Sequence, residues 1–96
     1  MYPKSRVLII AGSDSSGGAG IQADIKSVTA LGSYAATAVT ALTAQNTLGV
    51  TKIEAVTAGL VGDQMDAVVS DLGVDVVKTG MLFDASIVEE VVDRLR

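Results

Sequence analysis

A loop rich in glycine and serine carries the densest set of groups in this sequence that could meet a ligand. It lies within residues 10–26, which read I-A-G-S-D-S-S-G-G-A-G-I-Q-A-D-I-K. An apolar run precedes the loop, and a helical pattern follows it. A strand, a glycine loop and a helix in this order place free backbone amides and a helix N-terminus beside a possible ligand. The loop is therefore the first candidate for a binding site.

Three phosphate-binding templates test which ligand the loop could hold. Gly12 and Gly17 have the glycine spacing of the P-loop, but Gly18 and Ala19 stand where that motif needs lysine and a hydroxyl residue. The dinucleotide fingerprint G-x-G-x-x-A occurs at 18–23, yet it lies well beyond the strand end and lacks its acidic partner. The glycine loop of protein kinases is missing its companion motifs. The P-loop and kinase templates fail, and NAD binding is not expected.

The polar side chains in and after the loop have two alternative uses. They can cap the loop and the following helix by bonding free backbone amides, or they can contact a ligand. The sequence leaves both uses open for Ser13, Asp14, Ser15 and Ser16. For Asp24 the alternatives are a solvated side chain and a ligand contact.

The composition excludes several classes of function. The chain has 96 residues, a net charge of −4, three aromatic residues, and neither cysteine nor histidine. A chain without a basic stripe or stacking aromatics is poorly suited to nucleic acid. Without cysteine and histidine it has no disulfide, thiolate nucleophile, imidazole base or usual zinc ligand, and we expect no metal site. The apolar run near the N-terminus is too short for a signal peptide or a membrane span, so we expect a cytoplasmic protein without a membrane partner.

The strands that must position the loop follow from apolar and β-branched runs. Continuous apolar residues predict buried strands at 7–11 and 75–79. β-Branched residues favour a strand at 34–43, and a turn at 46–49 separates it from a short strand at 50–56.

Three helices follow from apolar stripes at helical spacing. The stripes predict helices at 20–31 and 61–72, each ended by a glycine, with Gln64 and the aspartates of the second helix on its solvated side. Asp84 is expected to cap a third helix, whose pattern still runs at the end of the chain. Alternating strands and helices predict an α/β fold, a mostly parallel sheet with flanking helices. So few strands also suggest the front portion of a longer domain.

Three motifs together resemble one family. They are the loop motif at 10–26, T-A-L-T-A-Q-N-T-L-G-V at 40–50 and V-V-K-T-G-M-L at 76–82, in the family's order and spacing. The chain resembles the hydroxymethylpyrimidine/phosphomethylpyrimidine kinases of thiamine synthesis, members of the ribokinase-like superfamily. The resemblance implies that residues 1–96 form the N-terminal segment of a single kinase domain with a ribokinase-like three-layer fold, whose C-terminal part is absent.

The resemblance also implies which residues bind a pyrimidine. The amide of Gln45 would pair with the ring nitrogen and the amino group, since a carboxamide offers a donor beside an acceptor. Asp24 would contact the substrate near its hydroxymethyl or amino substituent. Gly12 and Thr43 would make backbone contacts, and Met81 would form an apolar wall. The alternatives are a loop-capping amide for Gln45 and ordinary core packing for Met81. Lys78, in the third motif, could equally be a solvated or paired charge.

The family's reaction moves the γ-phosphoryl group of ATP to the hydroxymethyl oxygen, and a second phosphoryl group to the resulting monophosphate. Such a reaction needs Mg²⁺ and donors around the moving phosphate. Family members supply an anion hole and the adjoining catalytic residue from their C-terminal part, and nothing in residues 1–96 matches that motif. The resemblance therefore implies a substrate half-site, no catalytic residue in this chain, ATP and Mg²⁺ bound mainly elsewhere, and no activity of the chain alone.

Other functions stay open at this stage. A pyridoxal or pyridoxine kinase of the same superfamily can share the glycine loop, although T-A-Q-N-T favours the pyrimidine enzyme. A non-catalytic fragment that binds a pyrimidine or assembles with another chain is an alternative from a different class. An exposed sheet edge is expected where further strands would pair, so we expect a homo-oligomer.

Overall fold

The apolar run at the start of the chain forms the central strand of a four-stranded sheet. The computed structural model describes residues 5–96, and its first strand is β1 (Arg6–Asp14). β1 pairs in parallel with β2 (Tyr34–Asn46) on one side and with β4 (Val76–Thr79) on the other. β3 (Gly49–Ala55) runs antiparallel to β2, which gives the order β3-β2-β1-β4. The expected mostly parallel sheet is confirmed.

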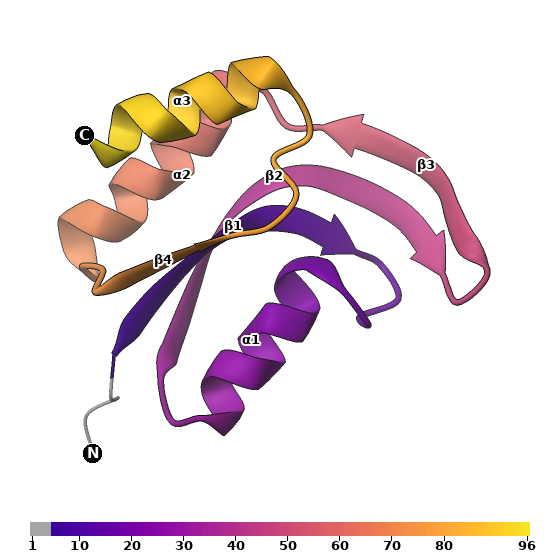
Figure 1. Cartoon of the computed structure of the whole chain (residues 1–96), viewed down its shortest axis with the longest axis horizontal. Coiled ribbons are helices and arrows are strands. Elements are labelled where there is room, and N and C mark those ends of the chain that lie inside the picture. Colours follow the sequence, from indigo (N-terminus) through magenta and orange to yellow (C-terminus); the bar gives the residue numbers. More distant parts are fainter. Residues whose placement is uncertain (1–4) are drawn as a thin grey trace.

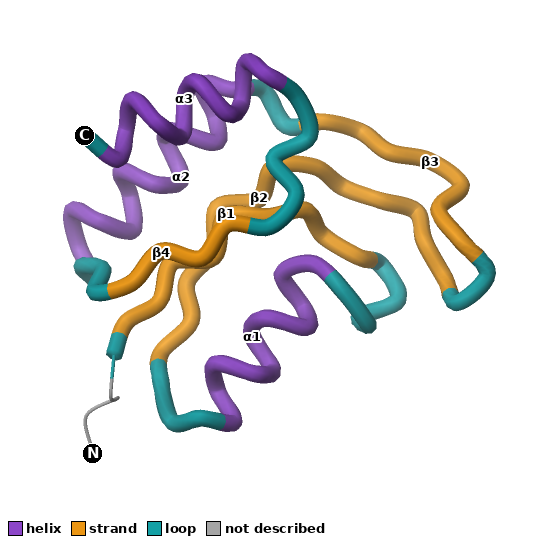
Figure 2. The backbone as a smooth tube through the Cα atoms, viewed as in Figure 1, coloured by secondary structure: helices purple, strands orange, loops and turns teal. Residues whose placement is uncertain are grey.

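Helices cover both faces of this sheet in three layers. Helix α1 (Gly20–Ala30) lies on one face, and helices α2 (Ala58–Asp71) and α3 (Ala85–Leu95) lie together on the other (Figure 1). The backbone trace in Figure 2 shows the sheet between these two layers. Residues 8–11 are all buried because helices cover β1 on both faces. A strand covered in this way needs apolar side chains on both sides, as the continuous apolar run supplies.

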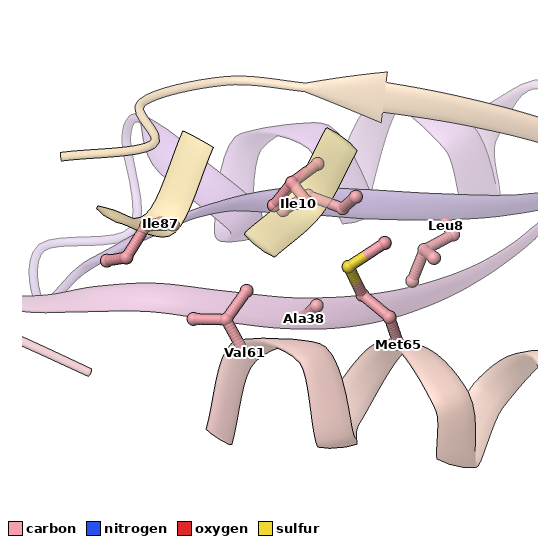
Figure 3. Packing of buried hydrophobic residues seen from close by; sticks show 7 residues of the cluster. Leu8, Ile10, Ala38, Val61, Met65 and Ile87 are labelled. Atoms are coloured by element: carbon pink, nitrogen blue, oxygen red, sulfur yellow. The ribbon is translucent and has the colours of Figure 1, made fainter. Parts of the chain in front are cut away.

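The main core lies between the sheet and the pair α2 and α3. Leu8 and Ile10 point to this side of β1, and Met65 of α2 reaches toward the sheet (Figure 3). The period of two along a strand sends Ile9 to the opposite face, toward α1. Helix α1 contributes no buried residue. The buried cluster consists of Leu8, Ile10, Ala38, Val61, Met65, Ile87 and Val91.

Helix boundaries follow the local signals in the sequence. Gly32 and Gly73 have φ values of 84° and 76°, the left-handed conformation that commonly follows a helix end. The Asp84 carboxylate accepts a hydrogen bond from the Ile87 N–H at 3.0 Å, which confirms the expected cap of α3. Helix α2 begins earlier than expected because the Thr57 hydroxyl caps it by accepting a bond from the Leu60 N–H.

Two expectations about burial are wrong. The strand expected to be buried at 75–79 is largely exposed, and Val76 in it is 51% exposed. The reason is that β4 lies at an edge of the described sheet. Gln64 is not solvated, because its amide donates to the Val39 carbonyl at 3.0 Å and accepts from the Val39 N–H at 2.9 Å. Gln64 thereby acts as a strand partner for β2 just before the pairing with β3 begins.

Beyond that point, β2 and β3 pair as an antiparallel ribbon, residues 41–55, and β1 lies beside it as far as Thr43. The ribbon extends past the helices (Figure 1), and every residue of β3 is exposed. Its register shifts between Ala44 and Gln45, which marks a bulge. The ribbon thus carries its side chains away from the main core and beside the end of β1.

Candidate functional site

The carboxylate of Asp14 organises the glycine loop, residues 15–19, between β1 and α1. One of its oxygens accepts bonds from the Ser16 N–H at 2.8 Å and the Ser16 hydroxyl at 2.7 Å. The other accepts from the N–H groups of Gly18 at 3.0 Å and Ala19 at 2.8 Å. These bonds, first of all that from the Ser16 hydroxyl, lower the pKa of Asp14 below its ordinary value. Asp14 is therefore a capping residue, held as a carboxylate within the loop.

This arrangement limits what the loop can bind. A phosphate at a glycine loop is held by free N–H groups at the helix N-terminus. Here the Asp14 carboxylate takes the N–H groups of Gly18 and Ala19, the two residues just before α1. These two loop amides are therefore not free to hold a phosphate.

Helix α1 fixes the loop from its other side. The Gln22 amide accepts a bond from the Asp14 N–H at 2.8 Å and donates to the Ser13 hydroxyl at 2.7 Å. The Lys26 ammonium donates to the Gly17 carbonyl at 2.9 Å. The loop is consequently tied to the helix that follows it as well as to Asp14.

Glycine is required where the loop meets β1. Gly20 has a φ of 59°, and a Cβ atom there would overlap the Gly12 carbonyl. A Cβ on Gly12 would lie 2.9 Å from the Met81 Cε, the flexible end of a side chain that can shift, so the requirement is strict only at Gly20. The absence of a Cβ at Gly20 lets α1 approach β1 closely.

The glycine loop, the segment after β4 and the ribbon line an open cavity of about 240 Å³ at the carboxyl ends of β1, β2 and β4. Ligands of open α/β sheets bind at this end of the strands. Four of the five predicted substrate residues line it: Gly12, Thr43, Gln45 and Met81. We call this cavity the strand-end pocket; its full lining is Gly12, Ser13, Asp14, Ala19, Gly20, Thr43, Gln45, Val50, Ile53 and Met81.

Gln45 and Thr43 form the polar side of the strand-end pocket. The Thr43 hydroxyl lies 2.8 Å from the Ser13 carbonyl and 3.0 Å from the Gln45 Oε1. A hydroxyl has one proton to donate, so these two acceptors share it. The bond to Oε1 orients the Gln45 side chain within the half-buried end of β2.

Met81 forms an apolar side of the pocket. It is 45% exposed, and it is therefore not ordinary core packing. The buried Thr40 hydroxyl donates to the Met81 carbonyl at 2.7 Å, which fixes the segment after β4. This bond fixes the backbone of Met81, so its flexible side chain starts from a constant position beside the pocket.

Asp24, the fifth predicted residue, is not brought into the lining. Its carboxylate forms an ion pair with the Lys78 ammonium at 2.8 Å, between α1 and β4. The Asp24 side chain is 23% exposed and that of Lys78 is 50% exposed. Lys78 is thus a paired charge, and Asp24 is not simply solvated.

Two lining residues, Val50 and Ile53, were missed by sequence reasoning. Val50 pairs with Gln45, and Ile53 pairs with Thr43, across the ribbon. The expected turn at 46–49 was a signal that these strands pair. The bulge between Ala44 and Gln45 changes the register, however, so the turn alone does not identify the partners.

The described residues offer few groups for ATP and Mg²⁺. In residues 5–96, no group of three or more histidine, cysteine, aspartate or glutamate residues gathers. The Gly18 and Ala19 amides of the loop are bound to Asp14. Neither observation assigns a nucleotide or Mg²⁺ site to this segment.

Comparison with known proteins identifies the family. A family model described as phosphomethylpyrimidine kinase matches residues 14–96. The chain belongs to this family. It is 58% identical over 94 residues to the thiamine biosynthesis bifunctional protein ThiED of Geobacter sulfurreducens, covering 98% of this chain and 19% of that protein. It is 57% identical over 89 residues to the hydroxymethylpyrimidine/phosphomethylpyrimidine kinase of Rhizobium meliloti, covering 93% of this chain and 34% of that protein.

Solved structures confirm the ribokinase-like fold. A phosphomethylpyrimidine kinase from Clostridium difficile superposes with a TM-score of 0.91 at 47% identity, over 96% of this chain and 40% of that one. A Bacillus subtilis pyridoxal kinase in complex with ADP superposes with a TM-score of 0.85 at 35% identity, over 95% of this chain and 36% of that one. The chain thus spans between about a fifth and two fifths of the length of these phosphomethylpyrimidine kinase relatives and of the pyridoxal kinase. Among residues 5–96, no helix has the length and apolar character needed to cross a bilayer.

Proposed function

We propose that this chain supplies the pyrimidine-binding part of a kinase in thiamine biosynthesis. The substrate would be 4-amino-5-hydroxymethyl-2-methylpyrimidine, followed by its monophosphate, with ATP as the phosphoryl donor. Residues 1–96 would form the N-terminal segment of a single kinase domain. The observation that carries the proposal is the convergence of Gly12, Thr43, Gln45 and Met81 on one pocket.

The chemistry of the strand-end pocket suits one substituted ring. Drug-sized ligands occupy pockets of roughly 300–1,000 Å³, so a cavity of about 240 Å³ favours a smaller molecule than a dinucleotide. The Gln45 amide offers a donor and an acceptor for an aminopyrimidine edge. Val50, Ile53 and Met81 offer apolar contacts to the faces of the ring. Asp24, held by Lys78 outside the pocket lining, would reach a substituent at the rim only by leaving its ion pair.

We place the phosphoryl-transfer chemistry outside this segment. The Asp14 carboxylate occupies two amides of the glycine loop, and no group of three or more carboxylates gathers in residues 5–96. The relatives are two and a half to five times as long as their matched regions, which leaves ample chain for ATP, Mg²⁺ and the catalytic group. The 96-residue chain alone should therefore show no phosphoryl transfer.

A pyridoxal kinase is the second candidate, because a pyridoxal kinase shares the fold at 35% identity. Calorimetric titration of the chain with the hydroxymethylpyrimidine and with pyridoxal separates the two. We expect tighter binding of the pyrimidine, and tighter binding of pyridoxal would overturn the choice. Gln45→Ala should weaken pyrimidine binding by roughly 10- to 100-fold, since two hydrogen bonds are lost. Lys52→Ala, on the same ribbon but outside the pocket lining, is the matched control and should leave the affinity unchanged.

The proposal also covers the location of the chain in the cell and its self-association. We place it in the cytoplasm, in keeping with the absence of a spanning helix in residues 5–96. The edge of β4, with Val76 half exposed, offers unpaired backbone groups to another strand. Self-association through this edge should appear as a concentration-dependent mass in sedimentation velocity, and a monomer at all concentrations would contradict it.

A further inference from the structure

Ser15 makes a contact that its position does not suggest. It is exposed and lies outside the lining of the strand-end pocket. Its hydroxyl nevertheless donates to the Gln45 carbonyl at 2.7 Å and accepts from the Gln45 N–H at 2.8 Å. One side chain of the glycine loop thus satisfies both backbone groups of the residue whose amide we assign to pyrimidine recognition.

The contact stands where regular pairing of β2 fails on both sides. Toward β1, the parallel ladder ends at the pair Asp14 and Thr43. Toward β3, the register shifts between Ala44 and Gln45. A strand residue at such a place has backbone groups that need other partners. The Ser15 hydroxyl is the partner of both Gln45 backbone groups. It takes the place that the next backbone pair of β1 and β2 would have had.

The anchor of this contact is rigid. Ser15 lies between Asp14, which is 4% exposed, and Ser16, whose N–H and hydroxyl both bond to the Asp14 carboxylate. The hydroxyl of Ser15 therefore projects from a loop that is itself fixed. Through it, the loop wall and the ribbon wall of the strand-end pocket are held at a constant separation.

We propose that Ser15 is a positioning residue that sets the placement of Gln45 for recognition of the amino-substituted pyrimidine edge. The inference deepens the proposed function and rests on it. Ser15 touches no substrate atom in this account. Its effect reaches the ligand through the backbone of Gln45, and so it should depend on the groups that Gln45 recognises.

The test compares Ser15→Ala with Ser15→Thr and with Ser70→Ala. The first variant removes the contact, the second keeps a hydroxyl, and the third is a matched control that removes the hydroxyl of an exposed serine on α2, outside the pocket lining. Two ligands are titrated into each protein: 4-amino-5-hydroxymethyl-2-methylpyrimidine and the same compound without its amino group. Hydrogen exchange of the Gln45 N–H, measured by NMR without ligand, reports the contact itself.

We expect Ser15→Ala to raise the exchange rate of the Gln45 N–H and the Kd of the aminopyrimidine, each by about tenfold. The Kd of the compound without the amino group should change by less than about twofold, because this compound lacks the group with which the positioned Gln45 amide would pair. Ser15→Thr should restore both values, and Ser70→Ala should leave the Gln45 exchange rate and both Kd values unchanged.

Three results would overturn the inference. Equal exchange of the Gln45 N–H in the wild type and Ser15→Ala would show that the contact does not exist in solution. An equal loss of affinity for both ligands would show a structural role alone. An unchanged affinity for both would show that Gln45 does not depend on Ser15. A wild-type chain that binds neither pyrimidine refutes the proposed function instead, and the exchange rates then still decide whether the contact exists.

Discussion

The main core and the strand-end pocket are built from the same two central strands but are held together by different forces. The core joins Leu8 and Ile10 of β1 to α2 and α3 by apolar burial. The pocket joins the end of β1 and the loop after it to β2 by hydrogen bonds that Ser15 donates to the Gln45 carbonyl and Thr43 donates to the Ser13 carbonyl. Burial stabilises the chain as a whole, whereas directional bonds fix a few groups in place. Substitutions in the core should therefore change stability, and substitutions in the pocket should change binding.

The largest effect is expected from Met65→Ala in the core. Met65 is 1% exposed and lies against the sheet (Figure 3), so truncation removes buried contacts and leaves a cavity. We expect a loss of about 3 kcal/mol in the free energy of unfolding, measured by urea denaturation. Val69→Ala on the same helix, at a position 56% exposed, should cost less than about 1 kcal/mol. Equal losses for the two variants would place the core elsewhere.

Gly20→Ala tests the junction between the two regions. The left-handed backbone and the overlap with the Gly12 carbonyl should together cost about 2 kcal/mol in stability. Pyrimidine affinity should fall as well, because Gly12 and Gly20 both line the pocket. Gly59→Ala in α2, where a Cβ meets nothing within 4 Å, is the control and should be neutral or slightly stabilising. A Gly20→Ala chain with wild-type stability and affinity would show that the close approach does not form.

The smallest effect concerns an ion pair remote from the pocket. Arg6 bonds to Asp75 at 3.0 and 2.9 Å, and this hydrogen bonding lowers the pKa of Asp75 to about 2. Because the folded value is depressed, the pair stabilises the fold above the unfolded pKa of about 4, and this contribution is lost as the pH falls toward 2. Asp75→Asn should flatten the fall in stability between pH 4 and 2, measured by urea denaturation. Asp71→Asn, on exposed α2 surface, should leave that slope unchanged.

Local signals predicted much of the fold from the sequence. The Asp84 cap and the glycines after α1 and α2 act over a few residues, so their effects are readable without the rest of the chain. The continuous apolar run of β1 likewise predicted a strand buried on both faces. The same kind of run failed for β4, since burial of a strand also depends on which strands lie beside it.

The candidate site was less predictable, because its bonds join residues far apart in the chain. Ser15 and Gln45 are 30 residues apart, and their contact depends on where the β1–β2 ladder ends. The Asp14 cap, in contrast, spans at most five residues, and the sequence offered it as one of two uses. Pairing of Asp24 with Lys78 spans 54 residues and could not be read from either motif.

The most direct test of the account is an NMR titration of the isotope-labelled chain with 4-amino-5-hydroxymethyl-2-methylpyrimidine. Saturable shift changes should gather at the strand-end pocket, in the backbone signals of Gly12 and Gln45 and the methyl signal of Met81. The core methyl signals of Val61 and Ile87 should stay in place. Shifts centred on the core, or no shifts at saturating concentration, would contradict the assignment of pyrimidine binding to this pocket.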